Sequence, residues 1–441
     1  MSNQSSSAAE GSASEKQLVR ALGVPGLAAN IVNTTIGAGI FVLPASVALL
    51  LGAAAPIAFV ITAIAMAVLV TSFALAGSRV SRSGGLYGHV ETAFGSYLGF
   101  IAGALLFINA CLGVSSVGSA FTGFIGTVFP IFAGQRGKVI LLFLAFAILA
   151  IINIRGVKSG ARAVGIVTVA KLVPLFIFIA VGLFFVQPSL IAWPGWPAAR
   201  PLGESVLLLV FAFSGIEIAL NPSGEVKNPA RTVPRAIFSA LALTTCVYIA
   251  IQLVAQGVLG NEMAQHQAAP LAEAASRFLG NGGHLLVLLG AIISSFGFIT
   301  SDMLSSPRTI YALSRDGVLP GFFGRVHERF RTPHVAIVSY AVVSYALAFS
   351  AQFEQLVRYS NVTLLTLYLL CCVATLRLLQ RDVRAEGEPL RFPGDFLCPI
   401  LGCALIVWIL TSAKYEEVRF TVDYLVGASV FFFARRLFRR T

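Results

Sequence analysis

Three ionisable side chains lie inside long apolar stretches of the chain, where a charge has few partners. Lys171 carries an ammonium group that could hold backbone carbonyl groups or pass a proton, and the Glu217 carboxylate could pair with the ammonium of a ligand, relay a proton or hold a turn of backbone. Asp302 follows Ser295 by seven residues on the same helical face and could face an inner vestibule or pair with Arg308. A charge inside a membrane span is costly, so all three are candidate functional residues.

Two of the apolar stretches are interrupted by small and helix-breaking residues. Residues 34–41 read Thr-Thr-Ile-Gly-Ala-Gly-Ile-Phe, and residues 211–217 read Phe-Ala-Phe-Ser-Gly-Ile-Glu. Lipid offers no partner to a free backbone N–H or C=O group, so such breaks need a water-lined cavity or closely packed neighbours. These are the first and sixth apolar stretches, which correspond under a five-plus-five repeat. Interrupted helices at matching positions in two halves favour the binding site of a transporter.

The composition indicates that the elements holding these residues are membrane helices. Of 441 residues, 57% are hydrophobic and 11% are charged, and the mean hydropathy is +0.86. An ordinary soluble domain carries about 25% charged residues. The 31 basic and 19 acidic side chains are too few to cover the surfaces of several soluble domains.

The same inventory excludes several classes of protein. The net charge of +12 comes from short basic clusters between apolar runs, so no nucleic-acid partner is expected. The six cysteines and five histidines form no disulfide framework and no metal-ligand spacing, so we expect no cofactor and no metal. The apolar stretches contain no Ser–His pair, aspartate dyad or HExxH motif, so we do not expect an enzyme.

A spanning helix needs about 20 mostly apolar residues, and twelve stretches qualify, with eleven as the alternative count. The expected spans are 27–50, 54–77, 90–118, 138–153, 162–186, 204–224, 236–259, 284–313, 334–350, 355–379, 396–412 and 420–434. Residues 1–22 predict a disordered cytoplasmic tail, and residues 23–437 a single transmembrane domain. Cytoplasmic loops carry the excess of Lys and Arg. With the N-terminus inside, the inner segments hold 23 of these residues and the outer segments 7, so both termini are expected in the cytoplasm.

Four separated motifs resemble those of the amino acid–polyamine–organocation (APC) superfamily of permeases. In chain order they are residues 37–41 (GAGIF), residues 83–87 (SGGLY), residues 211–217 (FAFSGIE) with 225–229 (EVKNP) and 234–237 (PRAI), and residues 311–320 (YALSRDGVLP) with 332–333 (TP). They match the first helix, the opening of the third, the sixth helix with its following loop, and the loop after the eighth helix of that family.

The resemblance implies the leucine-transporter fold, an all-α integral membrane protein of about 12 transmembrane helices. Helices 1–5 (about 27–186) and 6–10 (about 204–379) would form an inverted repeat, with extra helices at about 396–434. The substrate would sit between the broken helices 1 and 6. The family moves amino acids or related amines, mostly with protons or by exchange, so the implied partners are an amino acid, protons or a counter-substrate, and the lipid bilayer.

The expected substrate site lies at the two breaks. The N–H groups of residues 38–40, at the start of a half-helix, suit a carboxylate, and the carbonyl groups around residues 211–214 would take an ammonium. By resemblance, Thr34 or Thr35 and Ser115 border the pocket, and an aromatic residue at position 211 closes over the substrate. The expected substrate-binding residues are Thr34, Thr35, Gly37, Ala38, Gly39, Ile40, Ser115, Phe211, Ala212, Ser214 and Glu217.

Lys171 lies roughly 13–15 Å along the fifth span, close to the midplane. In sodium-independent family members a lysine of the fifth helix fills the place of a sodium ion and reaches helices 1 and 8. The resemblance therefore implies that Lys171 contacts carbonyl groups near Gly37 and hydroxyls such as Ser294 or Ser295, which argues against sodium coupling. A proton-carrying role and a purely structural role both stay open. Lys171, Ser294, Ser295 and Asp302 are the expected coupling or gating residues.

The sequence therefore predicts a sodium-independent amino acid transporter of the cytoplasmic (inner) membrane, working by proton symport or exchange as a monomer or homodimer. The small residues Ala38, Ser115 and Ser214 suit a neutral substrate. A polyamine or basic amino acid antiporter or exporter is the alternative, although a cationic substrate would want more acids than Glu217 and Asp302. A transporter-like sensor is the alternative from another class.

Overall fold

The structure is a computed structural model that describes residues 23–80, 85–156, 161–216, 229–315, 317, 319–384 and 389–438, without the side chains of 161–168, 229–231 and 436–438. Every regular element among these residues is a helix. The α-helices are α2 (Val24–Thr35), α3 (Gly39–Leu51), α4 (Ala55–Gly77), α5 (Gly85–Phe94), α6 (Ser96–Val128), α7 (Gln135–Arg155), α8 (Ala161–Gly182), α9 (Ala199–Phe213), α10 (Pro229–Leu259), α11 (Pro270–Arg315), α12 (His334–Ser350), α13 (Phe353–Gln380), α14 (Leu397–Leu410) and α15 (Tyr415–Phe438). Short 3₁₀ turns are η1 (Gly52–Ala54), η2 (Pro130–Phe132), η3 (Leu183–Phe185), η4 (Pro188–Leu190), η6 (Gly260–Gln265) and η7 (Gly321–Gly324).

Six helical segments of the described chain are long and apolar enough to cross a membrane. They are Gly39–Gly77, Ser96–Val128, Gln135–Arg155, Thr232–Gln265, Pro270–Arg315 and Phe353–Gln380. The count becomes seven if α14 and α15, which are bent by 119° at their junction, form one span. The expectation of an all-helical membrane protein is confirmed for this part of the chain. The count of twelve and the inverted repeat stay predictions.

Hydropathy underestimated several helices at their polar ends. The third span, expected at 90–118, is instead the short helix α5 followed by α6, which continues to Val128. Gly95 separates the two with φ 89°, a conformation that suits glycine. The helix expected from residue 284 begins at Pro270 and is kinked at Gly280 (φ 62°, ψ −156°). At α11 the helical hydrogen bonding extends through polar residues, where the apolar signal has already faded, whereas the apolar run of α6 itself continues to Val128.

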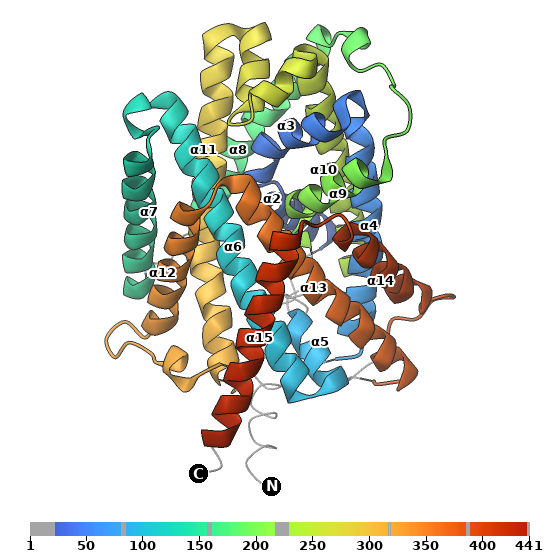
Figure 1. The fold of residues 1–441 in the computed structure, drawn as a ribbon, viewed down its shortest axis with the longest axis vertical. Coiled ribbons are helices and arrows are strands. Elements are labelled where there is room, and N and C mark those ends of the chain that lie inside the picture. Colours follow the sequence, from blue (N-terminus) through green and yellow to red (C-terminus); the bar gives the residue numbers. More distant parts are fainter. Residues whose placement is uncertain are drawn as a thin grey trace.

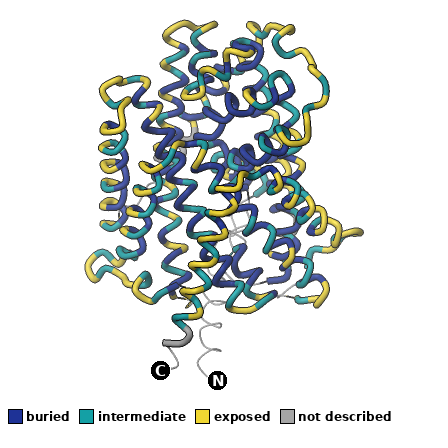
Figure 2. Tube along the Cα trace, in the orientation of Figure 1, coloured by how far each residue is buried: buried dark blue, intermediate teal, exposed yellow. Residues whose placement is uncertain are grey.

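The helices lie mostly along the long axis of the molecule, with α6 near its middle and α7 beside α12 at one side (Figure 1). Buried positions run through the centre and exposed positions lie on the outer faces (Figure 2). The outer face of α7 is a row of large apolar side chains, each about half exposed: Ile140, Phe143, Leu144, Ile148 and Ile151. Such a continuous apolar row faces hydrocarbon more favourably than water.

Hydrogen bonds from side chains to backbone carbonyl groups join helices that are distant in the sequence. The Tyr424 hydroxyl of α15 donates to Ala104 O of α6 at 2.8 Å, and Asn361 Nδ2 of α13 donates to Leu207 O of α9 at 2.6 Å. Polar groups of this kind stabilise helix pairs in lipid by about 0.6–2 kcal/mol each. The hydrogen bond from Asn361 fixes α9, which carries the second break, against α13.

A glycine–proline contact sets the spacing of α8 and α11. A Cβ atom on Gly290 of α11 would lie 2.8 Å from Cγ and 2.9 Å from Cβ of Pro174 in α8. The proline ring is rigid, so only a glycine lets the two helices approach this closely. The contact lies one turn from Lys171 on α8 and one turn from Ser294 on α11.

Replacing Gly290 by alanine should therefore force α8 away from α11. We expect Gly290→Ala to destabilise the detergent-purified protein by about 1–3 kcal/mol, the usual cost of overpacking a core, and to lower the midpoint of thermal unfolding. Gly282→Ala on the same helix is the control, because its Cβ would meet no atom within 4 Å. Equal midpoints for the two variants would contradict the packing argument.

Candidate functional site

The first break separates α2 from α3. Helix α2 ends at Thr35, Ile36 is extended (φ −75°, ψ 90°), and α3 begins at Gly39. The last carbonyl groups of α2 and the first amides of α3 therefore have no intrahelical partners. No side chain caps α3, and the Phe41 N–H returns to Ala38 O at 3.1 Å. The N–H groups of residues 38–40 lie ahead of the first full helical hydrogen bond.

Lys171 of α8 occupies the carbonyl end of this break. Its Nζ donates to Ile36 O at 2.8 Å and also to Asn33 O, and the side chain is only 7% exposed. The carbonyl end of a helix carries a partial negative charge, so a cation there is stabilised by the helix dipole as well as by the hydrogen bonds. One ammonium thus ties α8 to the end of α2.

The two serines expected beside Lys171 differ in their bonding. Ser295 Oγ donates to Ala291 O of its own helix at 2.7 Å. Ser294 Oγ is buried and has no hydrogen-bond partner among the described residues. Lys171 therefore contacts the first helix and forms no hydrogen bond with either serine. Its third N–H remains available, and the helix spacing set by Gly290 places Ser294 at the same level on the facing helix.

The second break begins where α9 ends at Phe213. Ser214 Oγ donates to Phe211 O at 2.8 Å, and Gly215 follows with φ 98°. A Cβ atom on Gly215 would lie 3.3 Å from Cγ2 of Thr34, so this turn of α9 passes directly beside the end of α2. The structure therefore brings the two interrupted segments into contact.

Tyr248 of α10 connects the two breaks, although it is not among the site residues predicted from the sequence. Its hydroxyl lies 3.0 Å from Thr35 O and 2.9 Å from Ala212 O, and the side chain is fully buried. One hydroxyl hydrogen is shared between two carbonyl groups, one from each broken helix. A signal was present: Thr244, Tyr248, Gln252 and Gln256 recur every fourth residue and form a polar stripe on an otherwise apolar helix.

The aromatic ring at position 211 lies against the first break. A Cβ atom on Gly39 would meet Cδ1 of Phe211 at 3.2 Å, so the glycine allows close approach. The ring also packs edge-on against Phe353 of α13, with centroids 5.9 Å apart. Phe211 thus stands between α3 and α13 at the expected site.

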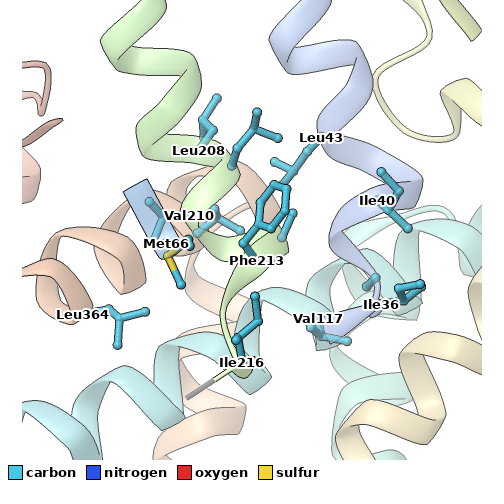
Figure 3. Close-up of a cluster of buried hydrophobic side chains, with 14 of the residues drawn as sticks. Ile36, Ile40, Leu43, Met66, Val117, Leu208, Val210, Phe213, Ile216 and Leu364 are labelled. Atoms are coloured by element: carbon cyan, nitrogen blue, oxygen red, sulfur yellow. The ribbon is translucent and has the colours of Figure 1, made fainter. Parts of the chain in front are cut away.

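Buried apolar side chains surround the breaks. Figure 3 shows Ile36 and Leu43 of the first broken helix and Phe213 and Ile216 of the second gathered in one cluster, with Val117 of α6 beside them. Thr34 Oγ1 donates to Asn30 O at 2.9 Å, whereas the buried Thr35 Oγ1 has no hydrogen-bond partner among the described residues. Of these two hydroxyls, only that of Thr35 thus remains available to a ligand.

Ser115 points away from the breaks. Its hydroxyl lies 2.8 Å from Ser344 O of α12 and 2.5 Å from Cys111 O of its own helix. Residues two positions apart on a helix differ by about 200° in direction, so Val117 faces the first break while Ser115 faces α12. The Ser115 hydroxyl therefore contacts α12, and its place at the pocket border stays a prediction.

Of the two acids expected near the site, the structure describes Asp302 and not Glu217. Asp302 accepts hydrogen bonds from Tyr340 of α12 and, at 2.9 Å, from Ser306, and it forms no ion pair with Arg308, which donates to Leu304 O. Glu217 lies outside the described residues. The part of the chain that the structure describes holds no cluster of His, Cys, Asp and Glu able to bind a metal ion.

The geometry places free amides at the start of α3 beside an apolar lining and beside carbonyl groups at the ends of α2 and α9, which already accept hydrogen bonds from Lys171, Tyr248 and Ser214. A helix N-terminus attracts a carboxylate and a helix C-terminus attracts a cation. The arrangement can therefore hold a small molecule that carries both charges.

The chain is similar to known amino acid permeases. The profile of a family described as amino acid permease matches residues 22–426. The branched-chain amino acid permease BcaP of Bacillus subtilis (strain 168) is 28% identical over 96% of this chain and 94% of its own. The methylthioribose transporter of the same organism is 27% identical over 96% and 94% of the two chains. The serine/threonine exchanger SteT, also of Bacillus subtilis (strain 168), is 27% identical over 88% of this chain and 89% of its own.

Removing the ammonium at the first break should loosen α2. We expect Lys171→Met to cost about 1.5–3 kcal/mol, the range for hydrogen bonds to a charged group, and to lower the thermal midpoint. Amide hydrogen exchange in residues 33–40 should become faster. Lys414→Met, at an exposed position, is the control. Unchanged exchange in residues 33–40 would show that Lys171 does not hold the break.

Removing the hydroxyl that joins the two breaks should separate them. We expect Tyr248→Phe to cost about 1–3 kcal/mol, because two buried carbonyl groups lose a donor. Spin labels on the described ends of α2 and α9 should show a broader distance distribution by electron resonance. Tyr415→Phe is the control, because that side chain is 77% exposed. A distance distribution as narrow as in the unaltered protein would show that Tyr248 does not hold the two breaks together.

Proposed function

The chain belongs to the amino acid permease family, and we propose that it transports neutral amino acids across the cytoplasmic membrane by alternating access, without sodium. The family match and the long apolar helices support a multi-pass membrane protein that transports amino acids. The neutral substrate, the coupling and an orientation with both termini in the cytoplasm are our proposals. The protein would act as a monomer or homodimer in the lipid bilayer.

The observation that carries the proposal is the meeting of the two interrupted helices. The free N–H groups of residues 38–40 lie at the start of α3. The carbonyl groups of residues 211 and 212 lie at the end of α9, where they already accept hydrogen bonds from Ser214 and Tyr248. Phe211 packs on Gly39, so these two helix ends are neighbours. An α-amino acid carries its carboxylate and ammonium on one carbon and would find a partner for each group here.

The described polar contacts favour a substrate with an uncharged side chain. Among the described residues, Thr34, Lys171, Ser214 and Tyr248 have side chains that form hydrogen bonds at the breaks, and none of these four is an acid. The relatives named for branched-chain amino acids and for serine and threonine transport neutral substrates by those names. A basic amino acid or a polyamine is the second candidate, carried by Glu217, whose position in the sequence adjoins the second break.

Lys171 supports sodium independence. Sodium in a protein is bound by oxygen atoms, and two carbonyl oxygens at the end of α2 already accept hydrogen bonds from the Lys171 ammonium. A fixed positive charge at that place also repels a second cation. The driving force would then be a proton gradient or a counter-substrate.

Uptake into proteoliposomes tests the proposal. Radiolabelled neutral amino acids, basic amino acids and putrescine are each supplied with and without an inward proton gradient, in sodium and in potassium buffer. A gradient of one pH unit supplies about 1.4 kcal/mol, enough for up to about tenfold accumulation per coupled proton. We expect accumulation of neutral amino acids that is equal in the two buffers.

Other outcomes of the same assay redirect or overturn the proposal. Uptake only into vesicles preloaded with an amino acid would identify an exchanger. Accumulation that requires sodium would contradict the role given to Lys171. Uptake of putrescine or basic amino acids alone would overturn the neutral substrate. No uptake of any compound would favour a sensor.

A further inference from the structure

Asp302 lies on α11 well away from the two breaks. It follows Ser295 by seven residues, about 10 Å along the helix, towards the end that the basic loops place in the cytoplasm. Its side chain is half-buried, while Ser301 and Ser305 on the same stretch are exposed. Asp302 thus lies between exposed positions of its own helix and the protein interior.

Three helices meet at this carboxyl group. The Tyr340 hydroxyl of α12 contacts Asp302 Oδ2, and it also lies 2.9 Å from Ala110 O of α6. Ser306 Oγ donates to Asp302 Oδ1 at 2.9 Å. Tyr340 is fully buried, so its hydroxyl has no access to solvent. The group formed by Asp302, Tyr340, Ser306 and Ala110 O is called the α6–α11–α12 junction below.

Counting hydrogens shows which form of Asp302 fits the junction. The Tyr340 hydroxyl has one hydrogen and faces two oxygen atoms, Asp302 Oδ2 and Ala110 O. If Asp302 is ionised, neither oxygen can donate, and the single hydrogen serves only one of the two contacts fully. If Oδ2 carries a proton, it donates to the tyrosine oxygen and the tyrosine donates to Ala110 O. Both contacts are then complete hydrogen bonds.

The charges around the junction are compatible with a protonated Asp302. The titratable groups that face Asp302 are Tyr340 of α12 and Cys111 of α6, and both are uncharged in their ordinary forms. On its own helix, Arg308 donates to Leu304 O, and on the neighbouring α8, Lys171 donates to α2. Among the described residues no cation therefore neutralises the carboxylate. A buried charge without a paired partner is costly.

We infer that Asp302 is a proton-binding site, filled from the cytoplasmic end, whose loading changes the connection between α6 and α11 through Tyr340. A proton from water adds to the carboxylate oxygen Oδ2, and the resulting carboxylic acid donates to the Tyr340 oxygen. The Tyr340 hydrogen then turns to Ala110 O. Loss of the proton returns the Tyr340 hydrogen to the carboxylate and releases Ala110 O. The inference rests on the proposed proton coupling and names the residue that carries the proton.

The junction also connects to the substrate-proximal part of α6. One helical turn beyond Tyr340, Ser344 O receives the Ser115 hydroxyl of α6, and Ser344 Oγ is buried without a hydrogen-bond partner among the described residues. Two residues further along α6, Val117 lies in the cluster at the first break (Figure 3). Exchange of the Tyr340 hydrogen bond at Ala110 can thus shift the helix that borders the site.

Two measurements on Asp302→Asn test the inference. In proteoliposomes we expect the rate of substrate counterflow to stay within about twofold of that of the unaltered protein, because exchange moves no net proton. Accumulation driven by the pH gradient should fall from up to about tenfold to none. In pH-difference infrared spectra of the full chain in lipid, the carbonyl band of a protonated carboxylic acid should be present in the unaltered protein and absent from Asp302→Asn. Tyr340→Phe should retain that band at a changed frequency.

Glu416→Gln is the matched control for both measurements, because Glu416 is an exposed acid outside the junction. The inference is overturned if Asp302→Asn retains gradient-driven accumulation, or if the infrared band persists in that variant. Loss of counterflow together with accumulation would also overturn it, since Asp302 would then serve transport itself. If the unaltered protein transports no amino acid, the proposed function fails, and the infrared band still decides whether Asp302 binds a proton.

Discussion

A helix that stops inside a bilayer exposes carbonyl and amide groups that lipid cannot satisfy, and the structure is organised around that problem at residue 36. On the carbonyl side of the break, Lys171 and Tyr248 reach in from α8 and α10 and donate to Asn33 O, Ile36 O and Thr35 O. On the amide side, residues 38–40 begin α3 without a capping side chain. The protein thus satisfies one end of the break with its own donors and leaves the other end for a ligand.

This constraint accounts for packing that is otherwise hard to explain. Lys171 reaches the end of α2 from a helix whose distance to α11 is set by Gly290 and Pro174. Tyr248 reaches both breaks because α10 packs beside α2, and its ring is held edge-on by Phe59 and Phe213 with centroids 6.2 and 5.2 Å away. These supports hold the donors in place, so that the carbonyl groups stay satisfied. The two breaks are thus held by a few hydrogen bonds from neighbouring helices.

The two tyrosines, Tyr248 and Tyr340, solve similar geometric problems in different parts of the fold. Each places one hydroxyl hydrogen between two oxygen atoms on different helices. At Tyr248 both acceptors are carbonyl groups and no titratable acceptor is involved, so the contact can only shift with the backbone. At Tyr340 one acceptor is a carboxyl group, so a proton can decide which contact is made. Helix movement and proton binding can thus act through the same kind of bond.

The sequence by itself determined that the chain is a helical membrane protein and where its two breaks lie. It also showed that Lys171 carries a charge inside an apolar span. Hydropathy, glycine content and charge within an apolar stretch are local properties, so they can be read without the tertiary structure. The sequence could not determine which way a side chain points. Ser115 and Val117 are two residues apart on α6, yet one faces α12 and the other the break. Nor could it identify the partners of Tyr248 or of Asp302, since both depend on which distant helices meet. Only tertiary packing decides those contacts, because a hydrogen bond requires two atoms within about 3 Å and spacing along the chain does not fix the distance between helices.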